Sequence, residues 1–225
     1  MTSEEQRVEA DCCSSGAAEA RIARHFDSRD FSVAPMLHET SARLLDQLRD
    51  VGDAHPTVLD LGSGAGALAV ALVEDGADRA LGIDLSPASV EAARRRAEAA
   101  GVMARATFRV GDAAAASLDP HDWVVMDRVI CCYVDMDRLL ANALPAARSR
   151  FAFAVPESRG WRGALNKVLW RLEDVVNVLR RNRCQGYVHD IRRIARRLVE
   201  AGFALRSERR TGLWYTAVFE RVEAD

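Results

Sequence analysis

The sequence predicts an α/β protein built on a mostly parallel β-sheet. Short apolar runs of the kind that form buried strands alternate with longer segments whose apolar residues recur at helical spacing. The first run, 58–61, leads into glycines at alternate positions, Gly62, Gly64 and Gly66, and a second run follows at 80–83. A strand, a glycine-rich turn, a helix and a second strand form a βαβ unit of the nucleotide-binding kind.

Two acids at the strand ends indicate which nucleotide this unit binds. Asp60 precedes Gly62 by two residues, and Asp84 ends the second strand. The glycine spacing fits a dinucleotide fingerprint only loosely, and a carboxylate at Asp60 would repel a pyrophosphate but suits a ligand with an ammonium group. Asp84 could accept hydrogen bonds from both hydroxyls of a ribose. A dinucleotide-dependent oxidoreductase and a βαβ domain without a ligand stay open as alternatives.

The remaining elements follow from apolar spacing and from turn residues. Ser86 and Pro87 suit the N-cap and first turn of a helix, and Gly101 and Gly202 suit helix ends. The expected helices are 17–26, 36–51, 65–74, 87–100, 137–147, 161–183 and 190–201, with a loop or short helix at 113–117. The further expected strands are 106–110, 123–126, 150–155, 203–209 and 213–221.

Four segments, in this order, resemble the class I S-adenosylmethionine (SAM) methyltransferases. They are Thr57–Gly66, the acid Asp84, Val110–Ala113 and Trp123–Asp127, and the likeness covers residues 48–156 and the C-terminal hairpin. More distantly, the chain resembles the magnesium-protoporphyrin O-methyltransferases and related bacterial methyltransferases of unassigned substrate. The resemblance implies a three-layer, Rossmann-like fold with helices on both faces of a seven-stranded sheet in the order 3-2-1-4-5-7-6, strand 7 being antiparallel.

The same resemblance implies the domain organisation and the cofactor site. Residues 1–16 are expected to be a disordered tail, and 17–225 a single domain with N-terminal cap helices at 17–51 and a lid-like insertion at 157–189. SAM, leaving as S-adenosyl-L-homocysteine, would lie at the carboxyl ends of the strands. The expected cofactor-binding residues are Asp60, Gly62, Ser63, Gly64, Gly66, Asp84, Leu85, Asp112, Ala113, Asp127 and Arg128.

The acceptor side carries a weaker sequence signal, because methyl transfer needs alignment but not always a base. His189, where the insertion rejoins the core, is the candidate base, although it or Asp190 could instead cap the next helix. Tyr133 is a second catalytic candidate that could orient the acceptor. Many members of the resembled family have a histidine near Cys131 or Cys132, and it is absent here. The expected substrate-binding residues are Cys131, Tyr133, Trp161, Trp170 and Tyr187.

Composition narrows the functional classes further. The 225 residues carry a formal net charge of −2, so no overall field attracts nucleic acid or acidic membranes. No apolar run is long enough to span a membrane and no signal peptide begins the chain, so a cytoplasmic protein is expected. The five cysteines form no C-x-x-C pattern, and no metal site is expected.

The function expected from these observations is methyl transfer to a small, flat or hydrophobic molecule, with or without a carboxylate. The protein is expected to be a monomer or a homodimer and not to bind nucleic acid. Two alternatives stay open: a protein that binds SAM without methylating (a sensor, an interaction module or a catalyst of another reaction) and an RNA methyltransferase.

Overall fold

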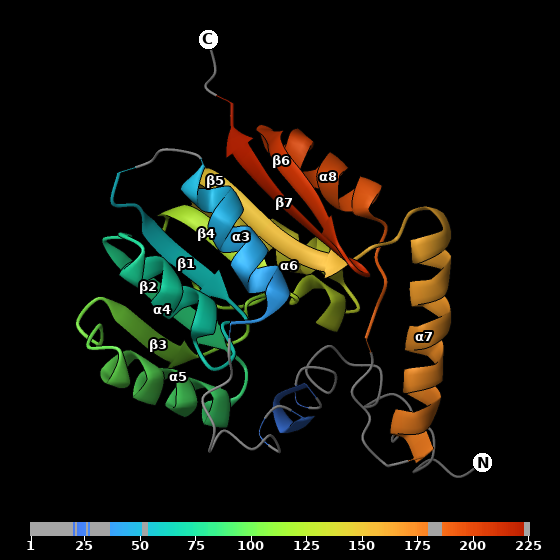
Figure 1. The fold of residues 1–225 in the computed structure, drawn as a ribbon, viewed down its shortest axis with the longest axis horizontal. Coiled ribbons are helices and arrows are strands. Elements are labelled where there is room, and N and C mark those ends of the chain that lie inside the picture. Colours follow the sequence, from blue (N-terminus) through green and yellow to red (C-terminus); the bar gives the residue numbers. More distant parts are fainter. Residues whose placement is uncertain are drawn as a thin grey trace.

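The computed structural model describes residues 20, 22–25, 27, 37–50, 54–179 and 186–222. Among them, seven strands form one sheet in the order β3-β2-β1-β4-β5-β7-β6 (Figure 1). Neighbouring strands are parallel except where β7 pairs antiparallel with β5 and β6. The strands are β1 (Thr57–Leu61), β2 (Arg79–Asp84), β3 (Ala106–Val110), β4 (His121–Asp127), β5 (Ala147–Pro156), β6 (Phe203–Thr211) and β7 (Trp214–Arg221).

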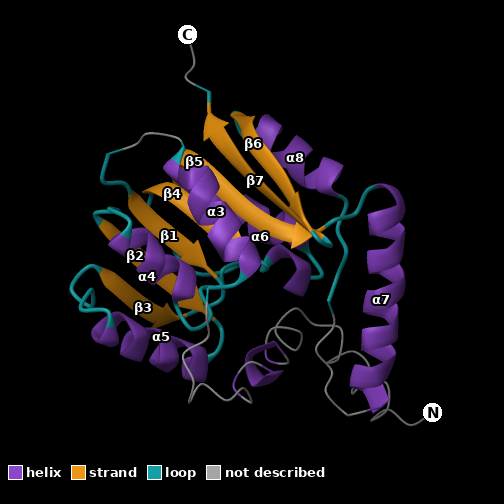
Figure 2. Ribbon diagram, viewed as in Figure 1, coloured by secondary structure: helices purple, strands orange, loops and turns teal. Residues whose placement is uncertain are grey.

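Helices cover both faces of this sheet (Figure 2). The covering helices are α3 (Glu39–Arg49), α4 (Ala67–Glu74), α5 (Pro87–Ala99), α6 (Met136–Ala143) and α8 (Ile191–Glu200), with short 3₁₀ turns η1 (Ile130–Cys132) and η2 (Leu144–Ala146), whereas α7 (Gly160–Leu179) stands beside the sheet. The described residues before α3 are helical at 20, 22–25 and 27. The predicted fold class and strand order are therefore confirmed.

Alternate residues of the central strands enter two separate cores. Val58 and Val125 pack with α3, α4 and α5 on one face of the sheet. Leu59 and Val124 pack with α6 and α8 on the other face. Because β1 and β4 are buried on both sides, their sequences read as continuous apolar runs rather than as an alternating pattern.

Several element boundaries differ from the sequence expectation. The helix expected over 137–147 ends at Ala143, because Pro145 lies in the 3₁₀ turn η2 and cannot continue an α-helix. Strand β5 consequently begins at Ala147, before the expected start. Helix α3 is shorter than expected and begins after His38, its N-cap. At 113–117, where a loop or a short helix was expected, the structure has a turn.

Parts of the chain for which predictions were made lie outside the described residues. These are the expected tail at 1–16 and the end of the long helix, 180–183. Among the described residues, no helix combines the length and the apolar character needed to cross a bilayer.

Candidate functional site

Three carboxylates meet at the carboxyl ends of β1, β2 and β4. Asp60 pairs in register with Gly82 of β2 and Val125 of β4, so it lies between these strands. Asp84 ends β2 and Asp127 ends β4. The order of the strands along the chain reverses between β1 and β4, which is where parallel α/β sheets bind their ligands.

The glycine turn after β1 has a conformation that other residues rarely adopt. Gly62, Gly64 and Gly66 all have positive φ angles. A Cβ atom on Gly62 would lie 2.4 Å from Val129 Cγ2, and one on Gly66 would lie 2.8 Å from Phe108 Cζ. A Cβ on Gly64 would meet nothing within 4 Å. Packing therefore requires the two outer glycines, whereas Gly64 borders open space that a ligand could occupy.

Asp60 is a buried acid with unused bonding capacity. It is 2 % exposed, and its Oδ2 has no hydrogen-bond partner among the described residues. Burial, together with the charges of Asp127 and Asp84, raises the pKa of Asp60 to about 8, although the backbone N–H of Ala69 acts in the opposite direction. A positively charged group placed here would relieve both the unmet hydrogen bond and the repulsion.

Asp84 orders the glycine turn as well as ending β2. Its Oδ2 accepts a hydrogen bond from Gly64 N at 2.8 Å, and its Oδ1 accepts one from Ser86 N at 2.9 Å. Burial raises the pKa of Asp84, and these two bonds oppose the rise. Ser86 caps α5 as expected, accepting from Ser89 N, and Leu85 packs against the core.

Arg128, directly after β4, combines backbone strain with an unmet donor. Its φ angle of 61° is unusual for a residue other than glycine, and such strain gathers at functional sites. Its Nε lies 3.6 Å from Asp127 Oδ1 and has no hydrogen-bond partner among the described residues. The buried Oγ of Ser63, in the glycine turn, is also unpartnered within the described part of the chain. Two buried donors without a hydrogen-bond partner, Arg128 Nε and Ser63 Oγ, therefore accompany the buried acceptor Asp60 Oδ2, which also has none among the described residues.

The start of α3 contributes side chains that the sequence did not indicate. Thr40 Oγ1 donates to Asp127 Oδ1 at 2.7 Å, and Ser41 Oγ donates to Asp127 Oδ2. His38 Nδ1 lies 2.9 Å from Thr40 Oγ1, and its ring meets Trp214 edge-on at 6.3 Å. Burial and the charge of Arg128 lower the pKa of His38. Thr40 and Ser41 lie within the helix expected over 36–51, and no local pattern could indicate their pairing with Asp127, which is more than 80 residues away in the chain.

The expected acceptor-side residues around η1 form a connected cluster. Tyr133 donates its hydroxyl hydrogen to Asp112 Oδ1 at 2.7 Å, so this hydroxyl already orients a carboxylate of the protein. Asp112 Oδ1 also accepts from Ala114 N, and the intervening Ala113 is buried. Tyr187 N donates to the carbonyl of Cys131 at 2.7 Å and holds the end of the insertion against η1.

His189 belongs to the same cluster. Its Nε2 lies 2.8 Å from the carbonyl oxygen of Tyr133, and because a carbonyl only accepts, this nitrogen carries a proton. Burial lowers the pKa of His189, against the effect of the Tyr133 and Ile130 carbonyls. Asp190, not His189, caps α8 by accepting from Arg192 N. A role for His189 as a base stays a prediction, and only Nδ1 of the neutral ring could then accept a proton.

The two cysteines of η1 both bond to one backbone carbonyl, and the nucleophilic thiolate form of Cys131 is disfavoured. The thiol groups of Cys131 and Cys132 lie 3.3 Å and 3.5 Å from the carbonyl oxygen of Arg128. A hydrogen bond with Cys132, and then burial, raises the pKa of Cys131 well above its ordinary value. A neutral thiol is a poor nucleophile and a poor metal ligand. No group of three or more His, Cys, Asp or Glu residues suited to a metal ion occurs among the described residues.

The two tryptophans expected in the substrate pocket lie on different sides of α7. Trp170 meets Trp214 edge-on at 6.4 Å and lies against Gly186, on the side of the protein body. Trp161 is 68 % exposed. Helical geometry separates residues nine positions apart by about half a turn. Trp161 and Trp170 therefore lie on different sides of α7, and their roles in substrate binding stay predictions.

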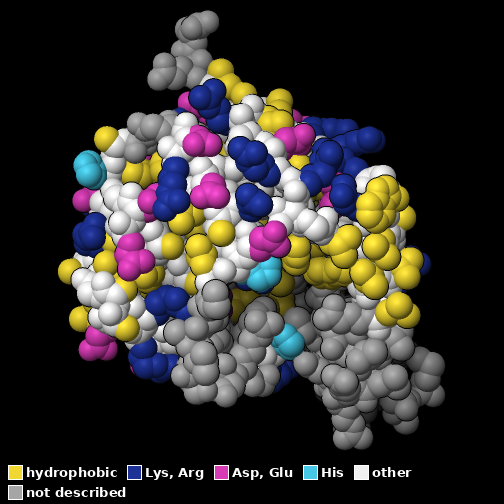
Figure 3. Space-filling view, viewed as in Figure 1, with side chains coloured by type: hydrophobic (Ala, Val, Ile, Leu, Met, Phe, Trp, Pro, Cys, Tyr) yellow, Lys and Arg dark blue, Asp and Glu magenta, His cyan; other side chains and the backbone are white. Residues whose placement is uncertain are grey.

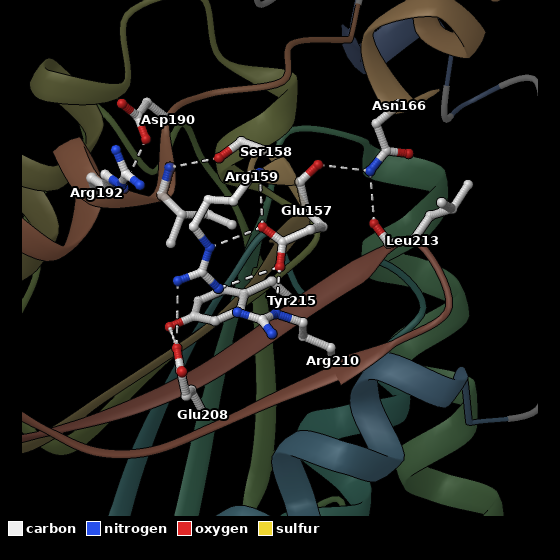
Figure 4. A network of polar contacts seen from close by, with 11 residues as sticks. Glu157, Ser158, Arg159, Asn166, Asp190, Arg192, Glu208, Arg210, Leu213 and Tyr215 are labelled. Atoms are coloured by element: carbon white, nitrogen blue, oxygen red, sulfur yellow. Dashed lines mark hydrogen bonds and ion pairs between the residues drawn. The ribbon is translucent and has the colours of Figure 1, made fainter. Parts of the chain in front are cut away.

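A polar network fixes the base of α7 at the end of β5 (Figure 4). The buried carboxylate of Glu157 binds Arg159 and Arg210 at 3.0 Å and 2.8 Å. Burial alone would raise the pKa of Glu157, but its hydrogen bonds to the two arginines lower it. Asn166 Nδ2 donates to the carbonyls of Glu157 and Leu213, each at 2.8 Å. The insertion therefore starts from a rigid junction with the β6–β7 hairpin.

Residues 58–151 match the family described as "Methyltransferase domain". The ribosomal protein L11 methyltransferase of Edwardsiella ictaluri is 44 % identical over 68 residues, which are 30 % of this chain and 23 % of the relative. The release factor glutamine methyltransferase of Rhodospirillum rubrum is 46 % identical over 69 residues, 30 % of this chain and 21 % of that protein. The chain thus covers less than a quarter of the length of these curated relatives.

Solved structures resemble the chain over most of its length. Magnesium protoporphyrin IX methyltransferase from Synechocystis PCC 6803, with bound S-adenosyl-L-homocysteine, superposes with a TM-score of 0.71 at 18 % identity, covering 91 % of this chain and 100 % of that one. Geranyl diphosphate C-methyltransferase from Streptomyces coelicolor A3(2) gives 0.67 at 15 % identity, covering 91 % and 98 %. At these identities the likeness establishes the fold.

Proposed function

We propose that this chain, which contains a methyltransferase domain and has the class I methyltransferase fold, binds SAM and transfers its methyl group to a small-molecule acceptor. One observation carries the proposal. At the reversal point of the sheet, a buried acid, Asp60, has an unmatched acceptor, and the strained Arg128 has an unmatched donor. An aminoacyl group, with one ammonium and one carboxylate, complements such a pair of side chains.

The residues present fit this cofactor. Asp60 and Asp127 would hold the ammonium group, and Arg128 the carboxylate. Asp84, whose two oxygens each accept one backbone hydrogen bond, keeps lone pairs for the ribose hydroxyls. Asp112 and Ala113, at the end of β3, would border the adenine. The bound cofactor supplies a methyl group on a good leaving group, the sulfonium.

Two histidines could take a proton from a hydroxyl or amine acceptor. His189 is held by the carbonyl of Tyr133, and His38 lies beside Thr40, whose hydroxyl donates to Asp127. His38 Nδ1 also caps α3 by accepting from Thr40 N at 3.2 Å. His38 could act as a base at Nε2 only in the tautomer in which Nδ1–H donates to Thr40 Oγ1 in place of this cap. His38 therefore joins His189 as a candidate base.

Aromatic side chains near the carboxyl-terminal edge of the sheet indicate the class of acceptor. Trp214, Trp170 and Tyr187 offer flat apolar surface, which favours a flat or hydrophobic molecule. The porphyrin and geranyl diphosphate methyltransferases of the same fold are consistent with this choice. The protein methyltransferases among the curated relatives match about 30 % of the chain and do not inform on the acceptor.

Calorimetric titration of SAM, S-adenosyl-L-homocysteine and NADH into the purified protein tests which nucleotide it binds. We expect the first two to bind and NADH not to bind. Micromolar binding of NADH without binding of SAM would contradict the proposal and restore the oxidoreductase alternative.

The reaction is tested by incubating cell extract with the protein and methyl-labelled SAM, followed by mass spectrometry. A labelled small molecule would identify the acceptor. Label in RNA would support the RNA methyltransferase alternative, and binding of SAM without any transfer would support a sensor or interaction module. A cytoplasmic location and a monomeric or homodimeric state stay predictions, to be checked by fractionation and light scattering.

A further inference from the structure

Helix α7 exposes a continuous stripe of large apolar side chains. Monomeric proteins rarely leave such a surface without a partner. Positions separated by three, four, seven or eight residues fall on one helix face. The exposed residues with this spacing are Trp161 (68 %), Leu165 (39 %), Val168 (54 %), Leu169 (42 %) and Leu172 (58 %).

The opposite face of α7 is the one that holds the helix to the protein. A Cβ atom on Gly163 would lie 2.2 Å from the Ser158 backbone, so the helix approaches the preceding loop closely. Asn166 is buried and hydrogen-bonded to two carbonyls, and Trp170 packs with Trp214. In helical projection these residues lie roughly 150° from the centre of the stripe. The stripe therefore faces away from the residues that attach the helix, and α7 itself stands beside the sheet (Figure 1).

Basic side chains flank this apolar stripe. Arg162 and Arg171 lie on its two sides, while Lys167 lies farther round the helix, roughly 145° from the centre of the stripe. Residues 160–172 contain no acid. The Arg162 guanidinium stacks over the Trp161 ring at 4.9 Å. In the space-filling view, the apolar patch over α7 adjoins a group of basic side chains over α8 (Figure 3). Residues 160–172 thus carry three positive charges, and α7 as a whole, which includes Glu173 and Asp174, carries a net charge of +1, whereas the whole chain carries −2.

We propose that α7 is a membrane-surface anchor that lies in the headgroup region of an anionic phospholipid bilayer. An apolar face that includes tryptophan, flanked by lysine and arginine, is the arrangement that binds such an interface. Long basic side chains beside the stripe can reach the lipid phosphates while their stems stay in apolar surroundings. This anchor rests on α7 alone and does not depend on the proposed methyl transfer.

The charges and the size of the stripe favour lipid over a second copy of the chain. Stable interfaces between protein copies bury about 1,000 Å² or more, whereas one helix stripe offers less. Two such stripes facing each other would also bring together the basic side chains at their edges, Arg162 and Arg171.

Vesicle co-sedimentation of the full chain tests the anchor. Vesicles of phosphatidylcholine alone are compared with vesicles containing about 30 % phosphatidylglycerol, because each basic residue near an anionic surface adds attraction. We expect binding to the anionic vesicles at least about tenfold tighter than to the neutral ones, and weaker binding as salt rises. Equal or absent binding to both would overturn the proposal.

Three variants separate the apolar and the basic contributions of α7 to vesicle binding. Trp161→Ala removes apolar area from the stripe and should weaken binding to the anionic vesicles about tenfold. The double variant Lys167→Gln, Arg171→Gln should weaken it by a similar factor and flatten its salt dependence. Leu205→Ala, which changes an exposed leucine of β6 (49 % exposed), is the matched control and should bind like the wild type.

Circular dichroism and SAM titration verify that each variant is folded, since all four altered side chains are exposed. Loss of binding that is equal in Leu205→Ala and Trp161→Ala would contradict an anchor on α7. A concentration-dependent dimer in light scattering that Trp161→Ala dissociates, without vesicle binding by the wild type, would assign the stripe to a second copy instead.

Discussion

At the scale of single residues, the site combines acids whose environments differ. Asp60 is almost fully buried with an unmet acceptor, whereas Asp84 is bound by two backbone N–H groups. Asp127 accepts from Thr40 and Ser41. Substitutions of these acids should therefore have different effects on stability and on binding.

Asp60→Asn should stabilise the free protein at neutral and alkaline pH while weakening SAM binding. The pKa of Asp60 is about 8 in the folded state, above its ordinary value of 3.8. The stability that its raised pKa contributes is complete below the ordinary value and is lost as pH rises to about 8. The asparagine does not ionise, so the advantage of the variant over wild type should grow across this range to a few kcal/mol, at about 1.4 kcal/mol per pKa unit.

Thermal unfolding of both proteins from pH 4.5 to 9, a window chosen to cover roughly this titration, measures the difference. A constant difference across the series would show that Asp60 titrates normally. Calorimetry at about pH 8 should show weaker SAM binding by the variant, because the amide cannot neutralise an ammonium group.

Asp84→Ala should lower SAM affinity by roughly 2–4 kcal/mol, because charge-assisted hydrogen bonds to the ribose are lost. The structure adds a second effect, because Gly64 N and Ser86 N both lose their acceptor. Asp84→Asn keeps one acceptor and is the matched comparison. Unchanged SAM affinity in a folded Asp84→Ala protein would refute the ribose role.

Gly62→Ala and Gly64→Ala separate packing from ligand approach. Both residues have positive φ, which costs an alanine about 1–2 kcal/mol. Only at Gly62 would the new methyl group also overlap Val129, adding about 1–3 kcal/mol. We expect Gly62→Ala to be the less stable protein in urea unfolding, and Gly64→Ala to lose SAM affinity out of proportion to its stability. The reverse order would contradict the assignment of open space to the ligand.

At the scale of elements, α7 depends on one buried side chain at its base. Asn166 joins the helix to β5 and to the β6–β7 turn through two carbonyls. One face of α7 is exposed, so its side chains contribute little to holding the helix. We therefore expect Asn166 to have a large effect on how firmly α7 is held.

Asn166→Ala would remove one donor from each of the Glu157 and Leu213 carbonyls, although the Leu213 carbonyl keeps the bond from Glu157 N at 2.8 Å, and we expect a cost of about 1–3 kcal/mol. Hydrogen exchange measured by mass spectrometry should accelerate in α7 and not in β1 or β4, which lie in the central cores. Exchange that is unchanged in α7 would show that the other contacts of the junction hold the helix. Lys167→Ala, an exposed change on the same helix, is the control.

At the scale of the whole molecule, long-range contacts determine which side chains of α7 face the protein body and which face the solvent. The sequence predicts a lid-like insertion whose Trp161 and Trp170 face the substrate. In the structure Trp170 faces Trp214, whereas Trp161 belongs to an outward apolar stripe. Amphipathic spacing shows that a helix has an apolar face, but the same spacing fits a face turned inward or outward.

The sequence by itself determined the sheet, its strand order through family resemblance, the glycine turn and the acids Asp60, Asp84 and Asp127, because these depend on local patterns of apolar runs, turn residues and spacing. Only the tertiary structure decided that Thr40 and Ser41 bind Asp127, that Tyr133 binds Asp112, and which way α7 faces. These contacts join residues far apart in the chain. Their partners are chosen by the packing of α3, η1 and α7 on the sheet, which no local pattern encodes.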